Sequence, residues 1–79
     1  MENLEKYKRA FVEGLDLDIS QVESASRIGV EKWDSIGQLN LTAILEDEFV
    51  IEFEPDDIMA FDSYAKGIEI LKRYGTDLG

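Results

Sequence analysis

Apolar residues recur at helical spacing in separate segments of this chain, and this pattern constrains its fold more than any other feature. Residues 2–13, 35–49 and 62–74 each follow the helical period. Pro55, followed by two aspartates, predicts a further short helix, because proline fits the first helical turn and acids favour its positive end. No segment alternates strongly enough to predict a strand. We therefore expect an all-α fold, a small four-helix bundle, with residues 1–79 forming a single domain.

The segment between the first two predicted helices, residues 15–33, lacks a sustained apolar period. We expect an ordered loop pinned by its apolar side chains, with one helical turn near residues 20–24, and we expect Gly14 to end the helix before it. The last helix is expected to begin near Asp62-Ser63 and to stop at Gly75. Its predicted inward-facing side chains are Tyr64, Ala65, Ile68, Leu71 and Tyr74.

The composition removes several classes of function. The chain has no cysteine and no histidine, which excludes disulfides, thiolate metal sites and the side chain most often used for proton transfer near neutral pH. The segment that begins at Asp16 does not match a calcium-binding loop, because Gln21 and Arg27 occupy the positions where such a loop requires Gly and Glu. We therefore expect neither a metal site nor catalysis by this chain.

The charge balance indicates the kind of partner. Eighteen acidic residues against eight basic ones give a net charge of −10, which argues against nucleic acid and anionic lipid and favours a basic protein surface. No N-terminal apolar run resembles a signal peptide, and no stretch is long enough to span a bilayer. We expect a cytoplasmic monomer without membrane insertion.

The predicted second helix carries two apolar groups on opposite sides. One group faces the expected core: Leu41, Ile44, Leu45 and Phe49. The other lies beside Asn40, Glu46 and Asp47 and consists of Ile36, Leu39, Ala43 and Val50. Either the helix is buried all round, or the second group forms a surface for partners. Acids at a helix C-terminus cost about 0.3–1 kcal/mol each. The position of Glu46, Asp47 and Glu48 therefore favours the partner surface.

Two similar Asp-Ser pairs open helices, Asp34-Ser35 and Asp62-Ser63. Aspartate and serine both cap helices, and Ser35 with Gln38 fits the spacing of a capping box, so capping alone is one interpretation of each serine. If Asp34 takes the cap, the Ser35 hydroxyl stays free near the positive end of the helix. Acids and a second apolar stripe follow Ser35 but not Ser63, which makes Ser35 the candidate modification site.

This segment resembles the attachment segment of acyl carrier proteins and related carrier domains. The matching residues are Trp33-Asp34-Ser35-Ile36, Leu39, Leu41 and Leu45-Glu46-Asp47-Glu48-Phe49. The order of helices, the long first loop and the short acidic third helix extend the resemblance over about the whole chain. The resemblance implies an acyl-carrier type of bundle, in which a phosphopantetheinyl transferase moves the 4′-phosphopantetheine of coenzyme A onto Ser35.

Such a protein is a free-standing carrier that holds an acyl or aminoacyl group as a thioester on this arm. The implied partners are the transferase, an acyl- or aminoacyl-loading enzyme and a downstream transferase or synthase. The residues that match partner-contacting positions are Asp34, Ile36, Leu39, Ala43, Glu46, Asp47 and Phe53.

The chain departs from the fatty-acid type of carrier at several positions, which are Trp33, Ile36, Gly37, Gln38 and Asn40. These departures suggest a dedicated pathway, such as polyketide-like, aminoacyl or surface-polymer assembly. The competing hypothesis is an acidic helical interaction module without a prosthetic group, which needs nothing from Ser35.

Overall fold

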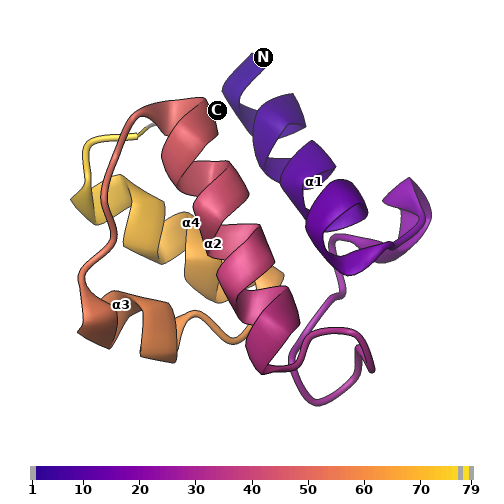
Figure 1. The fold of residues 1–79 in the computed structure, drawn as a ribbon. Coiled ribbons are helices and arrows are strands. Elements are labelled where there is room, and N and C mark those ends of the chain that lie inside the picture. Colours follow the sequence, from indigo (N-terminus) through magenta and orange to yellow (C-terminus); the bar gives the residue numbers. More distant parts are fainter. Residues whose placement is uncertain (1, 77, 79) are drawn as a thin grey trace.

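The computed structural model describes residues 2–76 and residue 78, and it places them in a small helical bundle (Figure 1). Its elements are the α-helices α1 (Glu2–Leu15), α2 (Ser35–Phe49), α3 (Pro55–Ala60) and α4 (Tyr64–Arg73), and the 3₁₀ helix η1 (Ile19–Gln21). Within the described residues there is no strand, only an isolated bridge between Ser26 and Ser63. The all-α prediction is confirmed. The predicted domain also includes Met1, Asp77 and Gly79, which lie outside the described residues.

The longest helices, α1 and α2, lie side by side and run in opposite directions (Figure 1). They approach closely, because a Cβ atom on Gly14 would lie 3.2 Å from the Cα atom of Leu41. The prediction that Gly14 ends the first helix is therefore wrong. The glycine lies inside α1, where its missing side chain admits α2, and α1 ends one residue later, before Asp16 with φ 56°.

The long loop between α1 and α2 is ordered, but only some of its apolar residues pin it. Val22 and Trp33 are buried in the core, whereas Ile19 and Ile28 are exposed. The predicted helical turn is present as η1, which begins one residue earlier and is shorter than expected. The loop thus crosses the end of the bundle on a few buried side chains and delivers Trp33 to the core directly before α2.

Aromatic rings form the centre of the core. The centroid of the Phe11 ring lies 5.1 Å from that of Tyr7, 5.5 Å from that of Trp33 and 5.6 Å from that of Tyr64. These are the edge-to-face contacts that aromatic pairs prefer. The Tyr7 hydroxyl donates a hydrogen bond to the carbonyl of Tyr64, which ties α1 to α4. Burial, with a smaller contribution from Tyr64, raises the pKa of Tyr7, so this phenol remains a donor at neutral pH.

Helix α4 turns a slightly different face to the core than the sequence predicted. Tyr64 and Leu71 are buried as expected, but Ala65 is exposed. The buried positions that the prediction missed are Gly67 and Ile70. A Cβ atom on Gly67 would overlap the Tyr7 hydroxyl and the Phe61 ring, so glycine is the residue that lets α4 approach α1.

The end of α2 is unusual. Val50 follows the helix with φ 54° and ψ 52°, the left-handed region that β-branched residues rarely adopt. Its N–H donates to the carbonyl of Glu46, and its side chain is 89% exposed. The helix therefore ends in a strained residue that presents an apolar side chain to solvent.

We predict that Gly67→Ala destabilises the bundle by about 1–3 kcal/mol, because the added methyl group overpacks the contact between α4 and α1. Urea unfolding followed by circular dichroism measures the change. Glu69→Ala on the exposed side of the same helix is the control and is expected to change stability by at most about 0.5 kcal/mol. A Gly67→Ala variant as stable as the control would contradict the tight packing described above.

Candidate functional site

The N-terminus of α2 leaves the hydroxyl of Ser35 free. Asp34 is the N-cap, and its Oδ1 accepts a hydrogen bond of 2.9 Å from the N–H of Gly37. Ser35 is the first helical residue and is exposed, and its hydroxyl makes no hydrogen bond within residues 2–76 and 78. The predicted capping box between Ser35 and Gln38 is wrong, because the aspartate occupies the cap position and Gln38 points into the core.

The second Asp-Ser pair is used differently. Ser63 itself is the N-cap of α4, and its Oγ accepts a hydrogen bond of 3.0 Å from the N–H of Lys66. The residue is half-buried, and the backbone beside it pairs with the long loop, where the carbonyl of Ala25 accepts from the N–H of Tyr64 at 3.1 Å. The two Asp-Ser pairs are therefore similar in sequence but not in structure: the Ser35 hydroxyl is free, whereas the Ser63 hydroxyl caps α4.

Helix α2 has an inner and an outer apolar face, as the sequence predicted. On the inner face Leu41 and Leu45 are fully buried, and Ile44 and Phe49 pack partly buried against the core. The outer side chains are exposed, by 70% for Ile36, 62% for Leu39 and 89% for Val50, and Ala43 is exposed with them. The alternative of a helix buried all round is excluded.

The acids at the end of α2 have two different roles. Asp47 and Glu48 are exposed, but Glu46 is half-buried, and its Oε2 accepts a hydrogen bond of 2.8 Å from the N–H of Phe53. This bond joins the end of α2 to the segment that leads into α3. Of the exposed acids, Glu48 lines a hollow with Lys6 and Arg9 of α1, so Asp47 is the acid that the outer face presents.

Phe53 does not lie on the surface that the resemblance implied for it. Its side chain is 5% exposed and packs edge to face against Phe61 at 6.2 Å and Tyr74 at 5.4 Å. The prediction that the Phe53 side chain contacts a partner is therefore wrong, because its ring is buried in the core between α3 and α4.

Three of the departures from the fatty-acid type are buried, namely Trp33, Gly37 and Gln38, and sequence reasoning missed the roles of the last two. A Cβ atom on Gly37 would overlap the carbonyl oxygen of Lys32 and lie 3.0 Å from Leu15 Cδ2, so any side chain is excluded there. Gln38 is 5% exposed. Its Oε1 accepts from Nε1 of Trp33, and its Nε2 donates to the carbonyls of Ile58 and Phe61. These two positions carry no acidic side chain because they are buried, so the absence of charge there does not describe the outer face.

An open hollow of about 250 Å³ lies beside the start of α2. Its charged and polar lining comes from Asp16, Lys32, Asp34 and Asn40, with Ile36 among the apolar residues. The Lys32 ammonium lies 2.7 Å from Asp16 Oδ2; this hydrogen bond lowers the pKa of Asp16 and raises that of Lys32. Both groups therefore stay charged at neutral pH, and the hollow combines this ion pair with apolar side chains.

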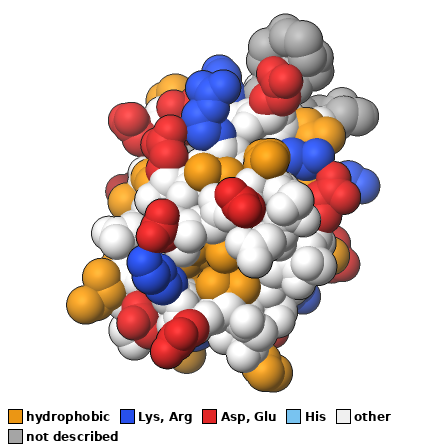
Figure 2. Space-filling view, turned by 90° about the vertical axis from the view of Figure 1, so that its right-hand side faces the viewer, with side chains coloured by type: hydrophobic (Ala, Val, Ile, Leu, Met, Phe, Trp, Pro, Cys, Tyr) orange, Lys and Arg blue, Asp and Glu red, His pale blue; other side chains and the backbone are white. Residues whose placement is uncertain are grey.

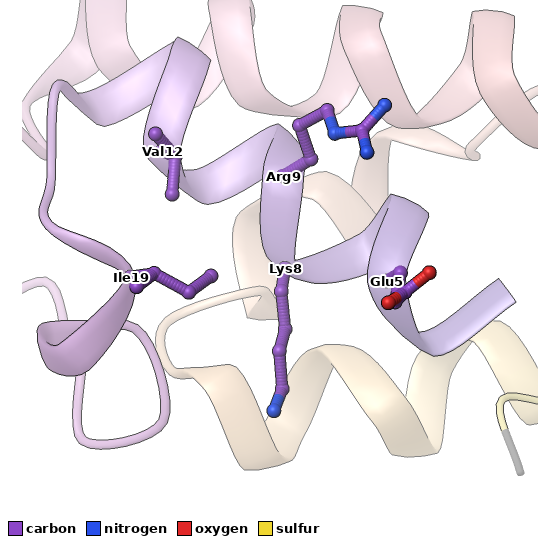
Figure 3. A pocket seen from close by; sticks show the side chains of 5 residues that line it. All are labelled: Glu5, Lys8, Arg9, Val12 and Ile19. Carbon is purple, nitrogen blue, oxygen red and sulfur yellow. The ribbon is translucent and has the colours of Figure 1, made fainter. Parts of the chain in front are cut away.

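A larger hollow of about 450 Å³ lies away from Ser35, between α1 and η1 (Figure 3). Val12 and Ile19 lie at one end of it, and Glu5, Lys8 and Arg9 project from α1 around the rest. Lys8 is paired with Glu23 at 2.7 Å. On the face that α1 forms, acidic and basic side chains are interspersed around hydrophobic ones (Figure 2). This hollow contains none of the predicted site residues.

We predict that the two serines differ in their effect on stability. Ser63→Ala is expected to cost about 0.5–2 kcal/mol because it removes the cap of α4, and Asp34→Ala a similar amount at α2. Ser35→Ala is the matched control and is expected to change stability by at most about 0.5 kcal/mol. Thermal unfolding of the three variants measures these differences; equal losses for both serines would show that Ser35 also caps its helix.

No protein-family model and no curated protein sequence matches this chain. In the part of the chain that the structure describes, no helix is both long and apolar enough to cross a membrane. Nor do histidine, cysteine, aspartate or glutamate side chains of that part gather in a group that could hold a metal ion.

Proposed function

We propose that this protein is an acyl or aminoacyl carrier whose 4′-phosphopantetheine arm is attached to Ser35. The observation that carries the proposal is the free, exposed hydroxyl of Ser35 at the first residue of α2, while Asp34 satisfies the helix cap. A serine that can be modified without loss of a structural hydrogen bond lies at the position that the family resemblance marks for attachment.

The surroundings of Ser35 fit a phosphodiester-linked arm. The helix N-terminus carries partial positive charge and favours a phosphate. The Gly37 N–H is already engaged by the Asp34 carboxylate, which also repels a phosphate, so the arm would extend away from the helix axis. The hollow beside Ser35 leaves room for this without displacing a buried side chain.

The chain itself contributes a nucleophilic oxygen and no base. Ser35 Oγ would form the bond to the phosphorus of the phosphopantetheine while the pyrophosphate bond of coenzyme A breaks and adenosine 3′,5′-bisphosphate leaves. The transferase would take up the hydroxyl proton, because this chain has no histidine. The attached arm supplies a terminal thiol, on which the cargo is held as a thioester.

The outer face of α2 is the surface best suited to the enzymes that load and unload the arm. It begins at Ile36, next to Ser35, continues through Leu39 and Ala43, and reaches the exposed acid Asp47. An apolar strip bounded by acids fits a partner with a basic, partly apolar surface, which agrees with the net charge of −10. Glu46 helps to hold the end of this face in place, because its carboxylate accepts a hydrogen bond from the N–H of Phe53.

The pathway we propose is a specialised one, with the transferase, a loading enzyme and a downstream transferase or synthase as partners. Because Trp33, Gly37 and Gln38 are buried, this specialisation rests on the exposed residues Ile36 and Asn40. An interaction module without a prosthetic group would use the same outer face, and modification of Ser35 distinguishes the two.

We predict that incubation with coenzyme A and a broad-specificity phosphopantetheinyl transferase adds the mass of one phosphopantetheine group, as intact-mass spectrometry would show. Ser35→Ala should abolish the gain, because the accepting oxygen is lost. Ser63→Ala, at the other Asp-Ser pair, should retain it. No gain with several transferases, or a gain that survives Ser35→Ala, would leave the interaction module as the function.

We predict that Asp47→Lys slows phosphopantetheine transfer, more so at low ionic strength, because electrostatic steering acts on the association rate. Transfer rates at two salt concentrations measure this. The matched control is Glu69→Lys on α4, which lies outside the proposed face. Glu46 is kept, since its loss would also break the bond to Phe53. Unchanged rates would mean that the transferase contacts another surface.

A further inference from the structure

The route from Ser35 into the bundle between α2 and α3 is closed by one buried amide. Gln38, one helical turn after Ser35, is hydrogen-bonded to Trp33 Nε1 and to the carbonyls of Ile58 and Phe61, the last at 3.1 Å. These partners belong to the loop before α2, to α3 and to the link between α3 and α4. An alkyl chain passing here would leave buried donors and acceptors unpaired.

Behind this amide the interior is filled by aromatic rings. Trp33 lies 6.0 Å from Phe61, and Phe61 lies 6.2 Å from Phe53, with the rings in edge-to-face contact. All these side chains are at most 5% exposed. Close-packed rings leave no volume for an alkyl chain unless they change rotamer or the helices separate.

Helix α3 is held to the end of α4 as well. Asp57 accepts from Arg73 Nη2 at 2.9 Å and from the hydroxyl of Tyr74, and this hydroxyl accepts from the N–H of Glu54 at 2.9 Å. Burial and the hydrogen bond to Asp57 raise the pKa of Tyr74, so the hydroxyl stays protonated at neutral pH. Moving α3 outward to admit a cargo would break these contacts in addition to those of Gln38.

The side of α2 that faces α1 is equally closed near Ser35. Gly14 approaches the backbone of Leu41, with 3.2 Å between the position of its Cβ and the Leu41 Cα. The Leu15 side chain reaches Gly37. The hollow that lies next to Ser35, lined by its neighbours Asp34 and Ile36, is open to solvent and contains the charged pair of Asp16 and Lys32. A long alkyl chain would stay largely in contact with water there and gain little, whereas a short or polar group loses nothing.

We propose that the bundle interior is closed to the cargo and that this carrier serves short or polar acyl or aminoacyl groups, which stay outside the bundle beside Ser35. This inference rests on the proposed function for the identity of the cargo, but the closed interior itself does not depend on how an arm is attached.

The chain contains no cysteine, so Ser35→Cys provides a single thiol for labelling without a transferase. One sample is alkylated with N-octyl iodoacetamide, and a second with an iodoacetamide that carries an oligoglycol chain of the same length. We expect the two melting temperatures to agree within about 2 °C. We also expect the NMR signal of the Trp33 indole N–H to be unchanged between them, because neither chain reaches Gln38.

A melting temperature that is several degrees higher with the octyl chain, together with a displaced Trp33 indole signal, would overturn the inference. Gln38→Met tests the amide itself, since it keeps the volume and removes the hydrogen bonds. In this background the octyl chain should raise the melting temperature relative to the glycol chain. If it does not, Gln38 is not the barrier; if the variant does not fold, the Ser35→Cys pair alone decides.

The two proposals fail in different experiments. Absence of mass gain with coenzyme A and transferase would refute the carrier function and leave the closed interior standing. If transfer succeeds, arms that bear acetyl and octanoyl thioesters are compared for their cleavage by hydroxylamine. Equal rates are expected for exposed cargoes, and several-fold protection of the octanoyl thioester would overturn the inference while leaving the carrier function intact.

Discussion

The buried side chain of Gln38 is the interaction on which the arrangement of this bundle depends. One amide accepts from the indole of Trp33 and donates to two backbone carbonyls at the end of α3, so it connects the long loop, α2 and the α3–α4 link. A buried polar group of this kind is costly unless all its partners are present. The orientation of Trp33, and with it the direction in which the chain enters α2 at Ser35, therefore follows from contacts made by residues far along the chain.

The free hydroxyl of Ser35 results from a choice between two adjacent capping residues. At α2 the aspartate caps, and the serine enters the helix; at α4 the serine caps, and the aspartate stays outside. The backbone before α4 is also paired with the long loop, because the N–H of Arg27 donates a hydrogen bond of 3.0 Å to the carbonyl of Asp62. Which serine keeps a free hydroxyl thus depends on a shift of one residue in where the helix begins.

Helical periodicity and turn residues were enough to predict the all-α fold, the bounds of α2 and the position of Pro55 at the start of α3. They also separated the inner from the outer face of α2, because that separation depends only on spacing along one helix. They could not predict the contacts of Gln38, whose partners lie 20 and 23 residues away, nor the burial of Phe53. The roles of Gly14 and Gly67 could not be predicted for the same reason. These glycines are needed because neighbouring helices approach closely there, and such an approach leaves no local sequence pattern.

The left-handed backbone conformation of Val50 at the end of α2 lowers the stability of the bundle. A glycine at this position would relieve the left-handed backbone, but it would also delete an apolar side chain from the outer face. Stability and the composition of the exposed surface therefore compete at a single residue. A glycine at position 50 is therefore an easy way to raise thermal stability, and affinity for the proposed partners is the property to measure when that change is made.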